Sequence, residues 1–405
     1  MQTYHPGMHP TIRPAEKNTT PHGPVRRNPA MTGLRCICCA RNYALQDLAI
    51  GCPHCAAAGN PASLEAVYSE FPRSLEISSP GYRFGSWLPY TEGVSLGEGN
   101  TPSFDLPRLA LEFGVDRLTA KHEGMNPTGS HKDRMSAHGI SRALEVGAQT
   151  VVLASSGNAA VSAAAYCAVA GLGCEVATYR NMPEPFVRAL NRLGAKRVIF
   201  DRSIDRWEYV RRQVECEGAF ALSNYNVPAV GSPVFGVEGY RAVALECVLD
   251  GIVPDHVLVP TARGDLLWGL YSGLRDLRAA GLIAHMPKLW AVEPFPRLTQ
   301  VLAGAPLQSE FLHATAQFST AGSTVTLQQQ LAVLNSGGGV VVADDNDAAN
   351  GVAQLGAQGL WVELCAGGCV SALARLCRQG RVLPTEHALL VLTAKGDRDT
   401  FDHKL

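Results

Sequence analysis

The sequence predicts an α/β protein with two doubly wound α/β domains, a cleft between them, and a small N-terminal cysteine module. From Leu118 onward, short β-rich runs alternate with helical patterns, which is typical of parallel sheets with crossover helices on both faces. The alternation is too long for one sheet of ordinary size, and 405 residues suffice for two well-packed cores. Two CxxC turns between Cys36 and Cys55 predict the additional module.

The composition is that of an ordinary globular protein, with 46% hydrophobic and 18% charged residues. A formal net charge of −1 gives no polyelectrolyte signal, so we expect no nucleic-acid partner. No apolar run approaches the roughly 18 residues of a membrane helix, and the N-terminus lacks the apolar region of a secretion signal. Most of the cysteines are scattered through apolar segments, as expected for small buried residues in a reducing compartment. We therefore expect a cytoplasmic protein without a membrane partner.

The first segment, residues 1–33, is expected to be a flexible tail, because Pro, His, Asn and Thr are frequent and no apolar period is visible. A zinc-ribbon-like module follows over residues 34–60. Twelve residues separate its two CxxC turns, and each turn can present two thiolates to one closed tetrahedral centre suited to structural zinc. Spacing favours four ligands over the nearby Cys38 and His54: Cys36, Cys39, Cys52 and Cys55. Unmetallated or disulfide-paired cysteines are the alternative.

The later elements alternate in a regular order. The first group is strand 151–154, helix 158–170, strand 175–179, helix 183–193, strand 197–200 and helix 205–216. The second group is strand 256–260, helix 266–280, strand 289–293 and strand 389–393. No internal repeat is evident.

The most informative segment is NPTGSHKDR, residues 126–134, which places Lys132 where a turn enters a helix. We expect Ser130 and Asp133 to form a capping box and the helix to run to about Val146. The positive end of a helix dipole disfavours a protonated amine, and a neutral amine is what carbonyl chemistry needs. A solvated lysine beside a cap is the alternative for Lys132 considered alone.

Three further segments suit the same kind of site. The turn Ser155–Asn158 between a strand and a helix can bind a carboxylate. The turn Thr261–Asp265 between strand 256–260 and the next helix can cradle a phosphate with its backbone N–H groups. Thr393 ends the last strand with a hydroxyl that can reach the cleft, although a β-branched residue is also ordinary in a strand.

Together these residues carry a family resemblance. NPTGSHKDR, ASSGNAAVSAAAY, VEGYRAVALE and the final strand with Thr393 resemble pyridoxal-phosphate enzymes of fold type II, the tryptophan-synthase β-subunit family. LRCICCARNYALQDLAIGCPHC followed by LGEGNTPSFDLPRLA resembles threonine synthases that carry an N-terminal zinc ribbon. The resemblance runs from about Leu34 to the end. It implies a large domain of residues 61–126 and 237–405, a small domain of residues 127–236, pyridoxal 5′-phosphate in the cleft, and a homodimer.

The resemblance also implies residue roles. Lys132 would bind the cofactor covalently and move protons at the substrate, Asn158 would hydrogen-bond the ring oxygen, and Thr393 would face the ring nitrogen. A neutral hydroxyl there does not force the nitrogen to be protonated, which makes a milder electron sink. The cofactor phosphate would be bound by Thr261, Ala262, Arg263, Gly264 and Asp265. The amino-acid substrate would be bound by Lys121, Asn126, His131, Ser155, Ser156 and Gly157.

Departures from the family pattern leave the substrate open. His131 stands where threonine synthases usually have Phe, and Ala262 and Arg263 replace Gly and Asn in the phosphate loop. For His131, packing against the cofactor is a commoner role than acid–base catalysis. The favoured activity is a lyase reaction that makes threonine from O-phosphohomoserine and water. The alternatives are β-replacement on O-phosphoserine or O-acetylserine, as in cysteate synthase, and a non-catalytic zinc-ribbon binding protein.

Overall fold

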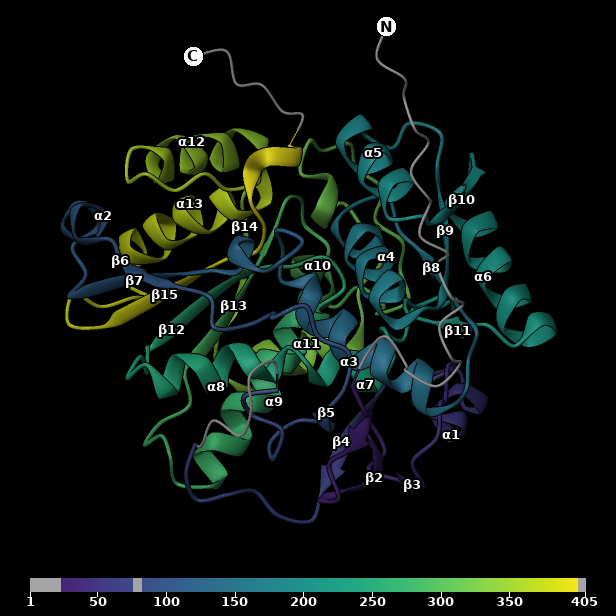
Figure 1. Cartoon of the computed structure of the whole chain (residues 1–405). Helices are drawn as coiled ribbons and strands as arrows, with labels where there is room; N and C mark the ends of the chain where they lie inside the picture. The colour runs from purple at the N-terminus through teal and green to yellow at the C-terminus, as the bar shows by residue number, and fades with distance from the viewer. Residues whose placement is uncertain (1–22, 76–81, 400–405) are drawn as a thin grey trace, which may run out of the picture.

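The computed structural model describes residues 23–75 and 82–399. Two mainly parallel sheets lie side by side with helices against their faces, and a small ribbon module packs below them (Figure 1). The predicted α/β class with two separate sheets is therefore confirmed. Within the described residues, no helix is long and apolar enough to cross a membrane.

The larger sheet has six strands in the order β14-β13-β12-β15-β7-β6. Their bounds are β6 Ser103–Asp105, β7 Arg117–His122, β12 His256–Pro260, β13 Lys288–Glu293, β14 Gly339–Val342 and β15 His387–Leu392. All neighbours are parallel except the edge pair β6–β7. Every residue of β12 is buried, as expected for a central strand covered on both faces.

Helices surround this sheet on both sides (Figure 1). They are α2 Pro107–Phe113, α8 Arg241–Leu249, α9 Asp265–Ala279, α10 Leu298–Leu302, α11 Leu327–Asn335, α12 Asp345–Gly356 and α13 Leu364–Arg378. Short 3₁₀ helices are η1 Glu123–Met125, η2 Phe318–Thr320 and η3 Gly396–Arg398.

The smaller sheet has four parallel strands in the order β10-β9-β8-β11. They are β8 Thr150–Ala154, β9 Gly173–Tyr179, β10 Lys196–Phe200 and β11 Phe220–Ala221. The helices of this part are α3 Lys132–Glu145, α4 Asn158–Ala170, α5 Glu184–Arg192, α6 Ser203–Glu217 and α7 Val234–Glu238. The predicted strands and helices of this part agree with these bounds to within two residues, because their apolar periods match their burial.

The ribbon module consists of the antiparallel strands β2 Met31–Cys36, β3 Asn42–Tyr43 and β4 Leu64–Tyr68, with helix α1 Pro53–Ala57. The module therefore extends beyond the predicted end at residue 60. The predicted tail also needs correction, since β1 Arg26–Arg27 pairs with β5 Tyr90–Glu92 and β2 begins at Met31. The remainder of that prediction, residues 1–22, lies outside the described residues.

Ion pairs join the ribbon to the larger body. Asp47 accepts from Arg142 of α3, with 2.8 Å between Oδ2 and Nη2. Glu65 of β4 accepts from Arg275 of α9, with 2.6 Å between Oε2 and Nη1. The ribbon thus lies against the helix that begins at Lys132.

Candidate active site

Lys132 is the first residue of α3, as predicted, but the predicted capping box is wrong. His131 is the N-cap and makes no side-chain cap hydrogen bond. The carboxylate of Asp133 instead accepts from the backbone N–H of Thr128 at 2.6 Å and from its hydroxyl. Asp133 thereby closes the turn before the helix, and the Lys132 N–H of the first turn donates to Ser130 Oγ at 3.4 Å.

The amine of Lys132 lies against Tyr240. Its Nζ is 3.4 Å from the Tyr240 hydroxyl and 5.7 Å from the centre of that ring. Burial lowers the pKa of Lys132, and the positive charge of Arg263 adds to this, whereas Asp265 and Glu363 oppose it. A larger share of neutral amine is the result, which suits a nucleophile toward a carbonyl group.

A buried carboxylate, Glu363, gathers two of the predicted site residues. Its Oε2 accepts from Asn158 Nδ2 and from Ser319 Oγ, both at 3.1 Å, and its Oε1 accepts from Thr393 Oγ1 at 3.1 Å. Arg398 Nη1 lies 3.4 Å from Asn158 Oδ1. Burial raises the pKa of Glu363 to about 6 despite these donors. Asn158 and Thr393, 235 positions apart, are therefore in one hydrogen-bonded group.

His131 is fixed by the end of the last strand. Its backbone N–H donates to the Thr393 carbonyl at 2.9 Å, and its Nδ1 lies 3.1 Å from the same oxygen. A carbonyl oxygen only accepts, so Nδ1 carries the proton. Burial holds the pKa of His131 well below its usual range, and nearby Lys132 adds to the effect. This neutral ring packs 5.5 Å from the Tyr240 ring, between centres, which favours a positioning role for His131.

The segment Thr261–Asp265 joins β12 to α9 and has its carbonyl oxygens engaged by side chains. The three donors are Arg297 Nη2 to Thr261 at 2.9 Å, Gln329 Nε2 to Ala262 at 2.8 Å, and Thr326 Oγ1 to Arg263 at 2.7 Å. Thr261 donates its N–H to the Val292 carbonyl at 2.8 Å, so the N–H groups that suit an anion are those that follow it, from Ala262 to Asp265.

Two residues of this loop have special geometry. Gly264 has φ of 87° at the N-cap of α9, and a Cβ atom there would collide with the side chain of Gln329, so only glycine fits. Asp265 directs its carboxylate to Ser232, accepting from its backbone N–H at 3.2 Å and from its hydroxyl at 2.7 Å. These two hydrogen bonds direct the negative charge of Asp265 toward Ser232.

The turn Ser155–Asn158 connects β8 to α4. Gly157 is the N-cap of α4 and makes no side-chain cap hydrogen bond, so the first N–H groups of this helix suit a carboxylate. Ser155 Oγ accepts from the Gly157 N–H at 3.4 Å. Ser156 Oγ accepts from Thr178 Oγ1 and from Arg206 Nη1, both at 3.2 Å. Of the two serines, Ser156 is thus already engaged by neighbouring side chains.

Lys121 and Asn126 are not brought into this group, which corrects the expectation that they face the substrate. Lys121 is fully buried and its Nζ lies 2.9 Å from Glu246 Oε2 and 2.7 Å from the Thr101 carbonyl. Asn126 donates to Glu123 at 3.0 Å and accepts from the Gly99 N–H at 2.9 Å. Buried charged and polar groups need such partners, so these ion pairs and hydrogen bonds hold both side chains in place.

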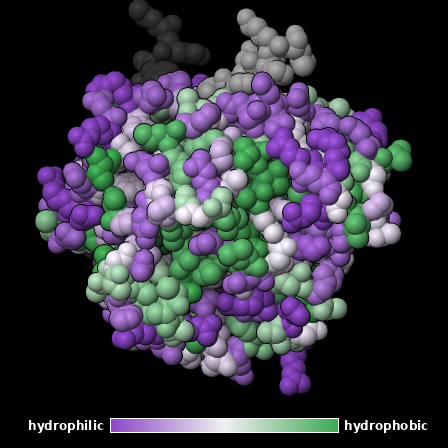
Figure 2. Space-filling view, turned by 180° about the vertical axis from the view of Figure 1, so that it is seen from behind, coloured by the Kyte–Doolittle hydropathy of each residue, from purple (hydrophilic) through white to green (hydrophobic). Residues whose placement is uncertain are grey.

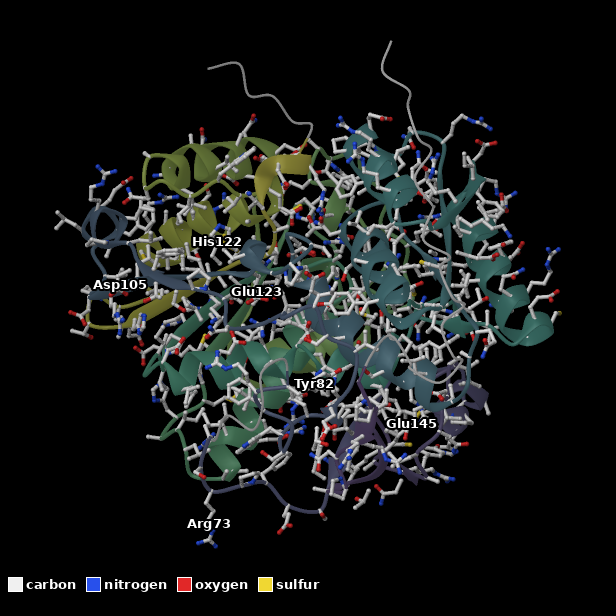
Figure 3. All side chains as sticks on the ribbon, viewed as in Figure 1. Arg73, Tyr82, Asp105, His122, Glu123 and Glu145 are labelled. Carbon is white, nitrogen blue, oxygen red and sulfur yellow. The ribbon has the colours of Figure 1, made fainter. Side chains whose placement is uncertain are left out.

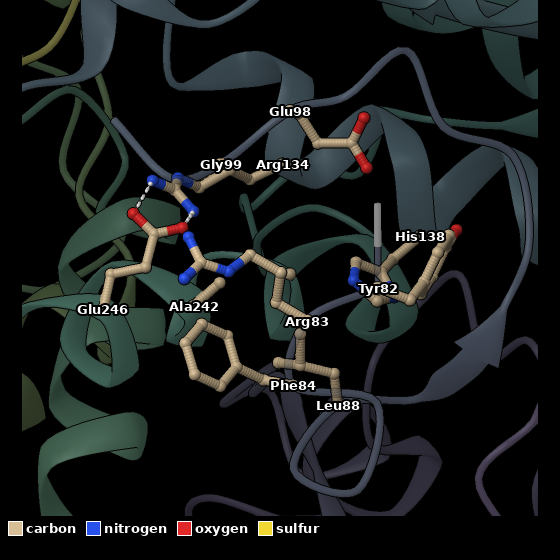
Figure 4. Close-up of a pocket in the computed structure, with 11 residues that line it drawn as sticks. Tyr82, Arg83, Phe84, Leu88, Glu98, Gly99, Arg134, His138, Ala242 and Glu246 are labelled. Atoms are coloured by element: carbon tan, nitrogen blue, oxygen red, sulfur yellow. Dashed lines mark hydrogen bonds and ion pairs between the residues drawn. The ribbon is translucent and has the colours of Figure 1, made fainter. Parts of the chain in front are cut away.

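Arg134 is the centre of that network. It pairs with Glu123 at 2.6 Å. It also pairs with Glu246 at 2.8 Å (Figure 4). Glu123 lies in the interior, in contrast to Arg73, which projects from the molecule (Figure 3). Gly99 has φ of 87°, and a Cβ atom there would lie 2.8 Å from Glu246, so the chain passes close over the network. The network braces the turn before Lys132.

The four predicted metal ligands are brought together in the ribbon. The Sγ atoms of Cys36, Cys39, Cys52 and Cys55 all lie within 4.8 Å of one another. All four are free thiols, and Cys38 and His54 are exposed outside this group. Four sulfur atoms at this spacing fit a closed tetrahedral site for one zinc ion.

Sequence reasoning missed several site residues, namely Tyr240, Glu363, Ser319 and Arg206. Tyr240 stands in the segment VEGYRAVALE, so the family resemblance could have identified it. Glu363 precedes α13 and Ser319 lies in η2, where no motif marks either residue. Arg206 is one arginine among several on α6 and has no sequence signal.

Known proteins agree with this geometry. The family model for pyridoxal-phosphate dependent enzymes matches residues 94–394. The threonine synthase of Methanosarcina acetivorans is 28% identical over 391 residues, covering 90% of this chain and 91% of that protein. That of Methanocaldococcus jannaschii is 28% identical over 393 residues, covering 90% of this chain and 92% of that protein.

Solved structures show the same fold. Maize serine racemase matches with a TM-score of 0.65 and 19% identity, covering 74% of this chain and 88% of its own. O-ureido-L-serine synthase matches with a TM-score of 0.60 and 21% identity, covering 76% and 95%. The expected fold type II, its pyridoxal-phosphate dependence and the similarity to threonine synthases are thus confirmed, and the chain belongs to the family of pyridoxal-phosphate dependent enzymes.

Proposed function

We propose that this protein is a threonine synthase, which converts O-phosphohomoserine and water to threonine and phosphate. The similarity to threonine synthases over 90% of the chain supports this activity. The observation that carries it is the Lys132 amine at the start of α3. Burial lowers the pKa of this amine, although the charges of Asp265 and Glu363 oppose the shift. The reaction needs an amine that can be neutral at working pH.

Several residues fit pyridoxal phosphate. Lys132 would bind its aldehyde carbon, Asn158 its ring oxygen and Thr393 its ring nitrogen. The loop Thr261–Asp265 would bind its phosphate through the backbone N–H groups that follow Thr261, since its carbonyl oxygens are engaged by side chains. The N–H groups at the start of α4, after Gly157, would hold the substrate carboxylate.

The bound cofactor would accept the electron pair left when a proton leaves Cα of the substrate. Lys132 would take that proton, and the nearby Tyr240 hydroxyl would orient its amine. A proton would then leave Cβ as the phosphate leaves Cγ, and Cγ would gain a proton to become a methyl group. Water would add its hydroxyl at Cβ, and a proton would return to Cα. Because Lys132 would carry out these proton transfers, its loss should slow the reaction at each of them.

The test measures threonine and phosphate formed from O-phosphohomoserine by the holoenzyme. We expect equal amounts of both products, and we expect Lys132→Ala to lower the rate by at least about 10³-fold. Lys288→Ala, at a partly exposed lysine paired with Glu386, serves as the control and should retain activity. A protein that takes up no pyridoxal phosphate would refute the proposal. Products from O-phosphoserine or O-acetylserine alone would favour the replacement reaction instead.

We also propose that Cys36, Cys39, Cys52 and Cys55 hold a structural zinc ion. Their mutual spacing within 4.8 Å supports this ligand set. The backbone N–H groups of Cys38 and Cys39 lie 3.4 Å from Cys36 Sγ, an arrangement that stabilises a thiolate. All positions of a tetrahedral ion would be filled by protein, so the ion has no open place for substrate.

A homodimer in the cytoplasm is the proposed form of the enzyme. Hydrophobic residues gather over the middle of the face turned away from the view of Figure 1, and such a patch suits a partner subunit (Figure 2). Twelve free cysteines suit a reducing compartment. Light scattering of the purified protein at micromolar concentration tests the dimer, and a monomer mass would contradict it.

A further inference from the structure

We propose that Arg206 and Arg263 form a subsite that binds the phosphoryl group on the substrate's side chain. The inference rests on the proposed function and names the residues that recognise its substrate. It starts from two arginines whose side chains hydrogen-bond only to hydroxyl groups in the part of the chain that the structure describes.

Arg206 lies on α6 and is only 7% exposed. Its guanidinium stacks on Tyr179, with Cζ 3.7 Å from the ring centre, and donates to the Tyr179 hydroxyl at 2.7 Å. It also donates to Ser156 and Ser203, both at 3.2 Å. Its buried Nε–H has no hydrogen-bond partner among the described residues. The group is therefore held rigidly in place with donor capacity to spare.

Arg263 lies in the loop between β12 and α9. Its Nε donates to Thr324 Oγ1 at 3.3 Å, and its Cζ lies 5.2 Å from the ring centre of Trp207. Trp207 is the neighbour of Arg206 on α6. Arg263 thus reaches from its loop across to the helix that carries Arg206.

Neither guanidinium forms an ion pair in the part of the chain that the structure describes. Burial lowers the pKa of Arg206 to about 10, and the positive charge of Arg263 adds to this. Burial also lowers the pKa of Arg263, although the charge of Asp265 opposes this shift. Two desolvated cations that form no ion pair are costly, and a dianion bound by both reduces that cost. Arginine forks match phosphate oxygens in geometry as well as in charge.

The position of the pair favours the substrate's phosphoryl group over two other anions. The substrate carboxylate has its own place at the uncapped start of α4. The cofactor phosphate has the backbone N–H groups of Thr261–Asp265, whereas the Arg263 side chain leaves that loop toward α6. Ser156, which contacts Arg206, links the subsite to the turn that would hold the amino acid.

The experiment titrates holoenzyme variants with O-phosphohomoserine and with homoserine, following the absorption of the bound cofactor. We expect Arg206→Gln and Arg263→Gln each to weaken O-phosphohomoserine binding by about tenfold or more. Homoserine binding and cofactor content should stay as in the wild type. Arg206→Lys should give an intermediate loss, because it keeps the charge and loses the fork. Arg212→Gln, at an exposed arginine on the same helix, should bind both amino acids normally.

Other outcomes overturn the subsite. Unchanged O-phosphohomoserine binding in both variants removes it directly. Loss of cofactor would assign the arginines to the cofactor phosphate, and an equal loss for homoserine would assign them to the carboxylate or to the turn at Ser156. If wild type binds no homoserine derivative, the proposed function fails, and O-phosphoserine against serine then tests the subsite alone. Equal affinity for that second pair overturns it.

Discussion

At the residue scale, Glu363 changes the chemistry expected of Thr393. The hydroxyl of Thr393 donates to Glu363 at 3.1 Å, so its lone pairs remain for whatever it faces. A ring nitrogen placed there would meet an acceptor, which favours the protonated nitrogen. The sequence had predicted a milder electron sink from the Thr393 hydroxyl alone. That prediction did not include Glu363, because no sequence motif marks this residue.

Glu363 also makes stability depend on pH in a definite direction. Burial raises its pKa from 4.5 to about 6 in the folded protein. Between these values the folded state binds more protons than the unfolded state, so the unfolding free energy rises as pH falls. The contribution is fully present below pH 4.5, is lost as pH rises through 6, and amounts to about 2 kcal/mol.

We therefore predict that Glu363→Gln in cofactor-free protein removes this pH dependence. The difference in unfolding free energy between wild type and variant should change by about 2 kcal/mol between pH 7 and pH 4.5. Urea denaturation at each pH measures it. Glu112→Gln, at an exposed carboxylate of α2, should run parallel to the wild type. A constant difference for Glu363→Gln would show that Glu363 does not titrate in this range.

At the scale of elements, the network of Lys121, Glu123, Arg134 and Glu246 ties β7, η1, α3 and α8 together. Three short ion pairs hold it, and all its side chains are at most 3% exposed. Removing one member of a buried network leaves an uncompensated charge, which costs more than the intact pair contributes. The network therefore fixes where α3 begins, and with it the position of Lys132.

Glu246→Gln should lower the unfolding free energy by about 3–5 kcal/mol, because Lys121 and Arg134 both lose a counter-charge. Urea denaturation of the holoenzyme checks the value. Glu92→Gln breaks the exposed pair with Arg26 and should change stability little. Equal effects for the two variants would mean that the buried network does not brace the fold.

At the scale of the whole molecule, local periodicity predicted most helices and strands. Motifs at the ends of these elements marked residues that meet in space, such as Asn158 and Thr393. Lys132, Asn158 and Thr393 each stand at a strand or helix end, which sequence patterns mark well. Lys121 was placed wrongly because its partner, Glu246, is 125 positions away and no local pattern reports such a pairing. Glu363 and Arg206 were missed for the same reason, since only the packing of distant elements makes them part of the site.

The ribbon offers the last test, because its proposed zinc site lies outside the catalytic group. Its ion pairs to Arg142 and Arg275 connect it to α3 and α9. A chelator should remove one zinc ion per chain. Metal binding to thiolates contributes folding free energy, so this removal should destabilise the protein. The midpoint of thermal unfolding should then fall by on the order of 5 °C.

Cofactor absorption at 25 °C should persist after chelation, because none of the four cysteines contacts Lys132. Cys36→Ser should reproduce the loss of zinc and of thermal stability. Cys38→Ser, at an exposed cysteine outside the ligand group, should keep both. Purified protein with four free thiols, no zinc and an unchanged unfolding midpoint would contradict a metal-stabilised ribbon. In that case the ion pairs of Asp47 and Glu65 would have to hold the module in place by themselves.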